Sequence, residues 1–206
     1  MALSGAKLAG GNPKNSRVEN DFYATDPKAV EMLLLKYGIK GNSILEPCIG
    51  GGHIAETIKN FYHNPINIMG LDIEDRGYPN TIVQDFLTWK TNKKFDCIIT
   101  NPPFSLAKEF IEKSFSLLTD NVDENDKPIG QVIMFLKIQF LEGEKRKELF
   151  EQYPPKYIYV FRKRMPTWNN GNQYDENGKR WATTMCHAWF VWEKGNKEEP
   201  IIRWLD

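Results

Sequence analysis

The sequence lacks several features that define large classes of proteins. Its 206 residues include only three cysteines, Cys48, Cys97 and Cys186, an odd number without the spacing of metal ligands. No stretch approaches the roughly 20 consecutive apolar residues that a membrane-spanning helix needs. Basic and acidic residues balance at 27 each, so no overall positive field draws nucleic acid to the chain. We expect a cytoplasmic protein without a metal or a membrane span, whose contacts with any polyanion are local.

Residues 1–20 differ from the rest of the chain in composition. Gly, Asn, Ser and Lys are frequent here, and this stretch offers little apolar surface to a core. We therefore expect residues 1–20 to form a flexible N-terminal arm. The remaining residues, 21–206, have a normal size for one α/β domain, and no second core begins within them.

Patterns typical of strands alternate with helical patterns in the first two thirds of the chain. Asp26 and Pro27 form a helix cap, and apolar residues follow at helical spacing. Strands that alternate with helices indicate a parallel sheet. Later the pattern changes, and the last two expected strands predict a hairpin. The expected strands are 43–45, 66–71, 81–83, 95–99, 131–135, 156–161 and 186–192; the expected helices are 27–36, 106–118, 142–152 and one that contains 54–58.

A long connection separates the two strands of that hairpin. Residues 162–185 far exceed the usual hairpin loop, and such loops in compact domains are usually functional or disordered. The window 156–192 holds six basic residues against two acids, with aromatic residues interleaved. Phosphate contact and base stacking require this combination. The alternative is a solvated, partly disordered loop. The candidate nucleic-acid contacts are Arg162, Lys163, Arg164, Trp168, Lys179 and Arg180.

Four consecutive residues, Asn101-Pro102-Pro103-Phe104, follow an apolar run where a buried strand should end. Open α/β sheets place their chemistry at that edge. The two prolines fix backbone angles, which can hold the Asn101 amide and the Pro102 carbonyl outwards. Phe104 adds a flat apolar face beside these acceptors. The group suits a planar base whose exocyclic amino group is held while it reacts, whereas the alternative is a tight loop without function.

A glycine turn follows the strand that ends near Glu46. The segment from Gly50 to Ala55 satisfies the dinucleotide-binding pattern G-x-G-x-x-A, which alone is a weak signal. Glu46 and Pro47 stand immediately before it and extend the pattern to Glu-Pro-x-x-Gly-x-Gly. Gly50 and Gly52 would let a ligand approach the backbone, because a glycine has no Cβ atom to clash.

These motifs together carry a resemblance to a known family. The tetrapeptide resembles the D/N/S-P-P-Y/F signature of S-adenosylmethionine-dependent amino-methyltransferases, which methylate the N6 of adenine or the N4 of cytosine. The glycine turn looks like the cofactor loop of adenine methyltransferases, and residues 21–27 look like their cofactor-covering segment. Together with the tail 188–195 and the ending 201–204, the chain is most similar to small phage-type DNA N6-adenine methyltransferases.

The resemblance implies a fold and a cofactor. The fold would be a single-domain Rossmann-like methyltransferase fold, with a mostly parallel, doubly wound sheet and a C-terminal antiparallel hairpin. The cofactor would be S-adenosyl-L-methionine. Glu46 would attract its ammonium and sulfonium charges, and Asp72 would bind the ribose hydroxyls. Asp85 would accept a hydrogen bond from the adenine amino group, and Phe86 would pack on the adenine unless it is a core residue. The expected cofactor-binding residues are Tyr23, Thr25, Pro27, Glu46, Pro47, Gly50, Gly52, Asp72, Asp85 and Phe86.

The implied activity is methyl transfer to the N6 amino group of an adenine flipped out of duplex DNA. Asn101, Pro102, Pro103 and Phe104 would be the catalytic residues. One departure is that many relatives carry a large target-recognition domain, for which 206 residues leave no room. Cytosine N4, RNA adenine and a protein glutamine amide are alternative substrates of the same chemistry. A dinucleotide-dependent oxidoreductase and a non-catalytic nucleic-acid-binding protein are alternatives from other classes.

Overall fold

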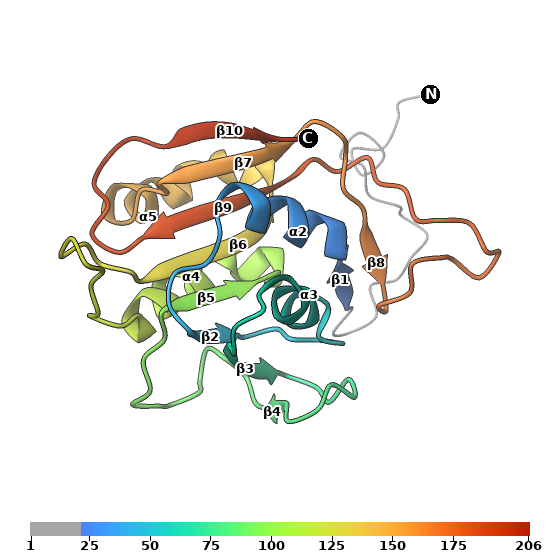
Figure 1. The fold of residues 1–206 in the computed structure, drawn as a ribbon. Coiled ribbons are helices and arrows are strands. Elements are labelled where there is room, and N and C mark those ends of the chain that lie inside the picture. The colour runs from blue at the N-terminus through green and yellow to red at the C-terminus, as the bar shows by residue number, and fades with distance from the viewer. Residues whose placement is uncertain (1–21) are drawn as a thin grey trace.

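A computed structural model describes residues 22–206, so the expected flexible arm at residues 1–20 lies outside the described residues. Eight strands form a central sheet in the order β10-β7-β9-β6-β5-β2-β3-β4 (Figure 1). Only β9 runs antiparallel to its neighbours within this sheet. The strands are β2 (Ser43–Glu46), β3 (Asn67–Asp72), β4 (Ile82–Val83), β5 (Cys97–Thr100), β6 (Gln131–Lys137), β7 (Tyr157–Phe161), β9 (His187–Glu193) and β10 (Ile201–Leu205).

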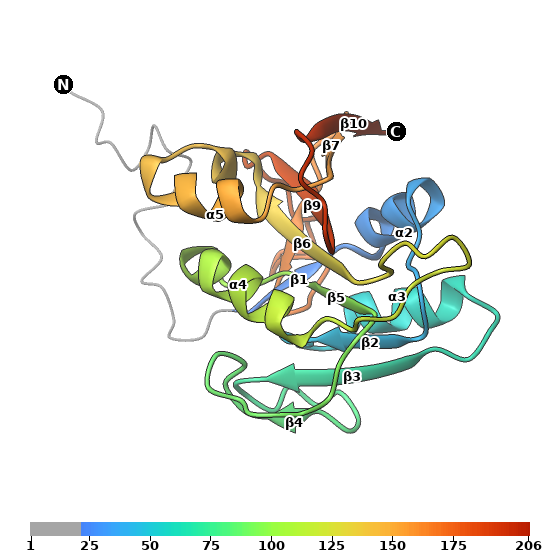
Figure 2. The same cartoon turned by 90° about the vertical axis from the view of Figure 1, so that its left-hand side faces the viewer.

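Helices cover both faces of the sheet. Helices α2 and α3 lie on one face, and α4 and α5 lie on the other (Figure 2). Neighbouring residues of the central strands therefore face different cores: Leu45 packs towards α4, whereas Ile44 packs towards α2 and α3. Burial on both faces is typical of parallel strands. None of the described helices has the length and apolar content to cross a membrane. The helices are α2 (Pro27–Lys36), α3 (His53–Phe61), α4 (Ala107–Leu117) and α5 (Lys147–Gln152).

The beginning of α2 matches the prediction, whereas that of α5 does not. The Asp26 side chain accepts a hydrogen bond from the Lys28 backbone N–H at 3.0 Å, and Pro27 is the first residue of α2. We predicted a helix from Glu142, but α5 begins only at Lys147. The preceding residues form short 3₁₀ turns, interrupted by Gly143 with φ +108°. An α-helix cannot continue through a left-handed residue of this kind.

The C-terminal strands form the predicted antiparallel pair together with two strands that we did not predict. Strands β7 and β9 pair antiparallel, and β9 also pairs with β6. Strand β10 pairs parallel to β7 at the edge of the sheet. Its residues 201–204 are exposed, so they lack the alternation that identifies a half-buried strand. The second new strand, β8 (Thr167–Asn169), lies inside the long loop and pairs with β1 (Tyr23–Thr25) in a separate two-stranded sheet.

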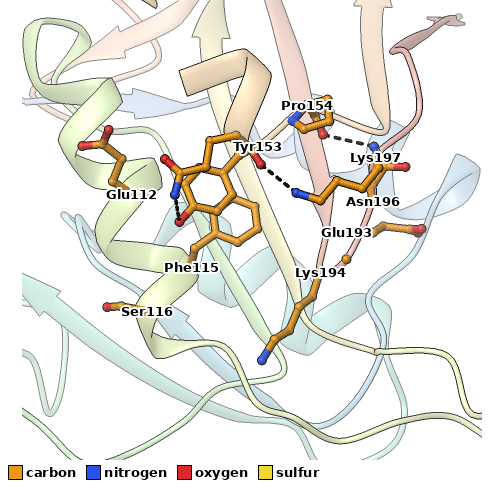
Figure 3. Close-up of a pocket in the computed structure, with 11 residues that line it drawn as sticks. Glu112, Phe115, Ser116, Tyr153, Pro154, Glu193, Lys194, Asn196 and Lys197 are labelled. Atoms are coloured by element: carbon orange, nitrogen blue, oxygen red, sulfur yellow. Dashed lines mark hydrogen bonds between the residues drawn. The ribbon is translucent and has the colours of Figure 1, made fainter. Parts of the chain in front are cut away.

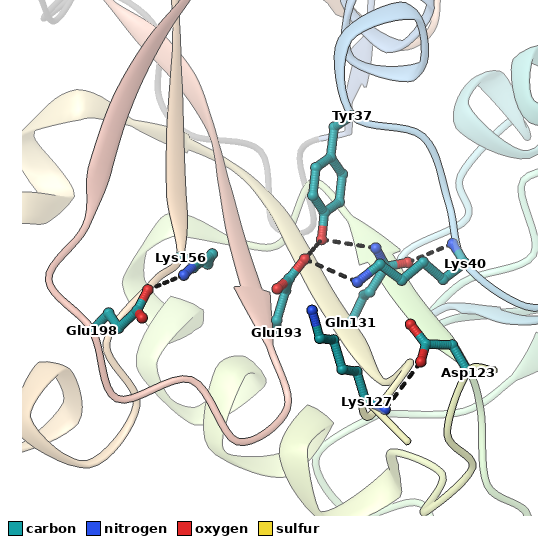
Figure 4. A network of polar contacts seen from close by, with 8 residues as sticks. All are labelled: Tyr37, Lys40, Asp123, Lys127, Gln131, Lys156, Glu193 and Glu198. Carbon is teal, nitrogen blue, oxygen red and sulfur yellow. Dashed lines mark hydrogen bonds and ion pairs between the residues drawn. The ribbon is translucent and has the colours of Figure 1, made fainter. Parts of the chain in front are cut away.

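A polar network closes the amino edge of the sheet (Figure 4). The Tyr37 hydroxyl, just after α2, donates to Glu193 at 2.8 Å, and the Gln131 amide donates to that hydroxyl at 2.8 Å. Lys40 joins both partners, through its backbone N–H to Gln131 and its ammonium to Glu193. Burial and the charge of Glu193 raise the pKa of Tyr37, which keeps the hydroxyl protonated as a donor. The network ties α2 to β6 and β9, far from the carboxyl edge.

Candidate functional site

Three predicted site residues meet at the carboxyl edge of the sheet. Glu46 is the last residue of β2, Asp72 is the last residue of β3, and Asn101 directly follows β5. These strands are neighbours in the order β5-β2-β3 and run parallel, so their carboxyl ends lie side by side. The arrowheads of β3 and β5 point towards β1 and β8 in Figure 1. The structure therefore brings together residues that lie far apart in the sequence.

The glycine turn between β2 and α3 lets two aromatic rings lie directly against its backbone. Gly50 and Gly52 have φ angles of +52° and +78°, which side chains rarely adopt. A Cβ atom at Gly50 would overlap the Phe22 ring, and one at Gly52 would overlap the Tyr78 ring. Asp72 fixes the turn because it accepts a hydrogen bond from the Gly50 backbone N–H at 2.8 Å. Pro47 is buried at the start of the turn.

Glu46 is an acid without a complete set of partners. Only 1% of the residue is exposed, and its Oε2 atom has no hydrogen-bond partner among the described residues. Burial raises the pKa of Glu46 well above its usual range, a hydrogen bond from the Ala55 backbone opposes this, and the nearby charge of Asp72 raises the pKa further. A buried carboxylate is stabilised by a cation. The residues present at this turn therefore fit a ligand that carries positive charge, as S-adenosylmethionine does.

The two residues predicted to hold the adenine differ in their placement. Asp85 lies after β4, and its Oδ1 atom accepts a hydrogen bond from the Leu87 backbone N–H at 2.9 Å. Phe86 is only 2% exposed and packs in the core, with its ring centroid 5.0 Å from that of Phe110. Phe86 therefore fits the alternative interpretation as a core residue, because little of its ring remains for stacking on a ligand. An aromatic residue at a strand end can pack in the core or stack on a ligand, and the sequence alone does not distinguish the two.

The predicted cofactor-covering segment is β1, which contacts the tetrapeptide. The Asn101 side chain donates through Nδ2 to the Tyr23 backbone carbonyl at 2.9 Å. Thr25 is 2% exposed, and its Oγ1 atom has no hydrogen-bond partner among the described residues. Pro27 begins α2 directly behind it. The segment thus connects the glycine turn, which Phe22 covers, with the end of β5.

The tetrapeptide presents acceptors. Because Nδ2 of Asn101 binds Tyr23, its Oδ1 atom faces away from that bond, and no described residue donates to it. No described group donates to the Pro102 carbonyl either, whereas the Pro103 carbonyl accepts from the Leu106 backbone N–H at 2.9 Å. Pro103 therefore starts the 3₁₀ helix Phe104–Leu106, and the first two residues keep their acceptor capacity.

Phe104 ends an aromatic column that sequence reasoning missed. Its ring stacks on His187, with centroids 6.0 Å apart, and His187 stacks on Phe135 at 4.9 Å. The Lys137 ammonium lies 4.7 Å from the Phe104 centroid. Burial lowers the pKa of His187, the hydrogen bond to the Met165 carbonyl opposes this, and the charge of Lys137 lowers it further. Phe104 itself is 37% exposed, so part of its ring remains accessible.

The long loop is ordered around β8 rather than structureless. Its predicted basic DNA contacts are all exposed: Arg162, Lys163, Arg164, Lys179 and Arg180. Arg180 forms an ion pair with Asp26 at 3.4 Å. Trp168, also predicted to contact DNA, is half-buried and packs edge-to-face against His53, with centroids 5.5 Å apart. Trp168 stands in β8, where it pairs with Ala24 of β1, and its contact with DNA stays a prediction.

A pocket of ≈ 290 Å³ lies elsewhere, between the ends of α4 and α5 and the turn after β9 (Figure 3). Phe115 and Tyr153 stack in it with centroids 4.0 Å apart. Its polar groups already have partners: Asn196 donates to the Pro154 carbonyl, and Lys197 donates to the Gln152 carbonyl. We therefore interpret the pocket as a gap in surface packing and not as a ligand site. Within residues 22–206 no group of His, Cys, Asp and Glu side chains is arranged to hold a metal ion.

No protein-family model matches the chain. The Type II methyltransferase M.CvrRI of Paramecium bursaria Chlorella virus XZ-6E is 33% identical over 100 residues, which cover 44% of this chain and 26% of that protein. The Type II methyltransferase M.TthHB8I of Thermus thermophilus is 26% identical over 91 residues, 41% of this chain and 21% of that protein. The matches thus span about a quarter of the lengths of these relatives.

Solved methyltransferase structures resemble nearly the whole chain in fold. The methyltransferase subunit of a type I restriction-modification system from Streptococcus thermophilus has a TM-score of 0.61 and 13% identity, over 90% of this chain and 48% of that one. A protein from Listeria monocytogenes described as a class I S-adenosylmethionine-dependent methyltransferase has a TM-score of 0.57 and 14% identity, over 87% and 62%. The predicted fold class is confirmed: the chain is a single α/β domain with the methyltransferase fold.

Proposed function

We propose that this protein transfers a methyl group from S-adenosylmethionine to the N6 amino group of adenine in DNA. The observation that carries the proposal is the pair of acceptors at Asn101 and Pro102, beside the accessible ring of Phe104. The similarity to Type II methyltransferases supports methyl transfer to DNA, without specifying the target base. The methyltransferase fold and those relatives support S-adenosylmethionine as the cofactor.

The glycine turn and its acids would hold the cofactor, which supplies an activated methyl group on a positively charged sulfur. Glu46 offers a buried carboxylate oxygen to the positive charges of the methionine portion. Asp72, at the end of β3, would bind the ribose hydroxyls. Tyr23 and Thr25 of β1 would line the other side of the cofactor site. Both left-handed positions of the turn are glycines, so no Cβ atom stands between its backbone and the rings of Phe22 and Tyr78 that cover it.

Asn101 and Pro102 would activate the amine. The lone pair of an exocyclic amine is delocalised into its ring, so the nitrogen is a poor nucleophile until it becomes pyramidal. Hydrogen bonds from the amino protons to Asn101 Oδ1 and to the Pro102 carbonyl strengthen as positive charge develops on that nitrogen. Fixed acceptors therefore stabilise the transition state more than the ground state. The methylated amine can release its proton along the same hydrogen bonds, so no strong general base is required.

The reaction needs the base outside the duplex stack. Flipping costs a few kcal/mol, and stacking on an aromatic side chain returns about 1–3 kcal/mol per base. Phe104 is the aromatic ring beside the acceptors, and His187 supports it from within the protein. The exposed basic residues of the long loop would contact phosphates of the same duplex.

Transfer of radiolabelled methyl groups to three separate substrates tests the proposed substrate. Wild-type protein is incubated with S-adenosylmethionine labelled in the methyl group and, separately, with unmethylated duplex DNA, with RNA and with a protein mixture. We expect label in the DNA and only background label in the RNA and the protein mixture. Label in RNA or protein alone would contradict the proposal.

Phe104→Ala is expected to weaken the use of DNA without affecting the cofactor. Removing the ring abolishes base stacking, worth about 1–3 kcal/mol. Because only 37% of Phe104 is exposed, we expect the lower end, about a fivefold decrease in kcat/KM for DNA. Steady-state kinetics with varied DNA concentration measure this value. Leu106→Ala, a nearby residue that is 39% exposed, is the matched control and should retain wild-type kinetics. Equal losses in both variants would argue against stacking.

Lys179→Gln is expected to reduce the salt dependence of DNA binding. Removing one cation from a phosphate lowers the slope of log K against log salt concentration by about 1. Lys179 is exposed near the tip of the long loop. Fluorescence anisotropy of a labelled duplex at several salt concentrations gives the slope. Lys127→Gln, at the amino edge (Figure 4), is the control and should leave the slope unchanged. An unchanged slope in Lys179→Gln would show that Lys179 does not contact a phosphate.

A further inference from the structure

The long loop meets the glycine turn through two side chains, those of His53 and Phe22. His53 is the first residue of α3 and follows Gly52. A Cβ atom at Gly51 would lie 3.4 Å from His53 Nδ1, and one at Gly171 in the long loop would lie 3.7 Å from Nε2. The imidazole therefore stands between the two loops. Trp168 of β8 adds an edge-to-face contact to the same ring.

The ring of His53 has different surroundings at its two nitrogens. Its Nε2 atom faces Gly171 in the long loop, whereas its Nδ1 atom lies on the side of Gly51. Nδ1 is buried and has no hydrogen-bond partner among the described residues. Burial lowers the pKa of His53, and the Gly171 backbone opposes this effect.

The strand pair that holds the loop is too small to be stable alone. Strands β1 and β8 share three residue pairs, and the Asn170 backbone N–H adds a hydrogen bond of 2.8 Å to the Phe22 carbonyl. An isolated two-stranded ribbon is marginally stable at best in water. Its stability here depends on the surface below, where Phe22 covers Gly50 and lies 6.1 Å from His53 between ring centroids.

Two buried polar atoms of β8 point to the same conclusion. Trp168 Nε1 and Asn169 Oδ1 are buried without a hydrogen-bond partner among the described residues. Buried polar atoms are normally paired in folded proteins. Each unpaired buried group lowers the stability of β8 in its docked position. The strand therefore depends on the surface beneath it, and a ligand that ordered the glycine turn would stabilise the docked strand.

We propose that His53 is a positioning residue that docks β8 onto the glycine turn, so that cofactor binding and closure of the long loop stabilise each other. The proposal rests on the proposed function, because it takes S-adenosylmethionine as the ligand of the turn. The ion pair between Arg180 and Asp26 also holds the part of the long loop that follows β8. Cofactor and DNA should therefore raise each other's affinity, since such coupling is reciprocal.

Limited proteolysis tests the docking without requiring DNA. The exposed residues Lys163, Arg164, Lys179 and Arg180 are trypsin sites within the loop. S-adenosylhomocysteine, the cofactor without its methyl group, serves as the probe. We expect it to slow cleavage within the loop at least fivefold in the wild type and less than twofold in His53→Ala, at saturation in each. His63→Ala removes an exposed histidine just beyond α3 and should behave as the wild type.

A second pair of measurements separates docking from folding. Gly171→Ala disturbs the same contact from the loop side, because Gly171 has φ +74° and its Cβ would lie 3.2 Å from His53 Cε1. Both variants should keep a cooperative thermal transition. In both, the ratio of DNA dissociation constants without and with S-adenosylhomocysteine should fall from at least 5 in the wild type to about 1. His53→Gln retains a side-chain donor and should recover part of the ratio.

The outcomes distinguish the two proposals. Equal protection of the loop in wild type and His53→Ala, at saturating S-adenosylhomocysteine, overturns the docking role while DNA methylation by the wild type still supports the proposed function. Loop protection that depends on His53, in a protein that methylates no DNA, overturns the proposed function alone. If calorimetry shows no binding of S-adenosylhomocysteine to the wild type, both proposals fall.

Discussion

Replacing Asn101 with alanine is expected to lower the rate of methyl transfer about 100- to 1,000-fold, because the substitution removes one fixed acceptor for the developing positive charge. The side chain holds its amide nitrogen on the Tyr23 carbonyl, and this leaves Oδ1 as the acceptor. Glu46 and Asp72, which we propose bind the cofactor, stand on other strands, so cofactor affinity should stay within about threefold of the wild type. Single-turnover kinetics and calorimetry with S-adenosylhomocysteine measure the two quantities.

Two further variants give this experiment its controls. Asn125→Ala removes the same side chain from an exposed turn at the amino edge and should keep full activity. Asn101→Asp keeps an acceptor oxygen but loses the donor to the Tyr23 carbonyl, so its rate should lie between those of wild type and Asn101→Ala. Wild-type rates in Asn101→Ala would show that the tetrapeptide does not activate the amine.

Glu46→Gln is expected to weaken cofactor binding about 10- to 150-fold. A hydrogen bond to a charged group is worth about 1.5–3 kcal/mol, and the substitution removes the negative charge that would face the cofactor's cations. Calorimetric titration with S-adenosylmethionine measures the dissociation constant. Glu124→Gln, an exposed acid at the amino edge, is the control. A cofactor affinity in Glu46→Gln equal to that of the wild type would place the cofactor elsewhere.

The same substitution should stabilise the protein when no cofactor is bound. Burial raises the pKa of Glu46 in the folded state above its value in the unfolded chain. Between those two pKa values the folded state binds more protons, so the free energy of unfolding falls as the pH rises through this window. Glutamine has no proton to lose. We therefore expect Glu46→Gln to have the higher melting temperature at neutral pH and a flatter dependence of stability on pH.

The sequence predicts those parts of the fold that depend on local patterns. Asp26 and Pro27 mark the beginning of α2 because a cap and a first-turn proline act within a few residues. The edge at which Glu46, Asp72 and Asn101 meet follows from parallel strands alternating with helices, which requires no knowledge of distant contacts. The fold class was predictable for the same reason, whereas the roles of the site residues stay predictions.

Contacts between distant segments could not be predicted in this way. The pairing of Ala24 with Trp168 joins segments that lie far apart in the sequence. Each of the two strands has only three residues, too few to show the alternation typical of a strand. The sequence therefore did not predict that Trp168 packs on His53, and its contact with DNA stays a prediction. We predicted that Phe86 stacks on the ligand unless it is a core residue. Its burial depends on partners such as Phe110, which lie far away in the sequence. Each of these contacts comes from packing, which a single sequence does not display.

Nucleoside analysis of methylated DNA tests the central claim most directly. Unmethylated duplex DNA is incubated with wild-type protein and S-adenosylmethionine, digested to nucleosides and examined by mass spectrometry, with Asn101→Ala treated in parallel. We predict N6-methyladenine in the wild-type sample and at least 100-fold less in the variant. N4-methylcytosine instead, or equal N6-methyladenine in both samples, would contradict an adenine amine held by Asn101 and Pro102.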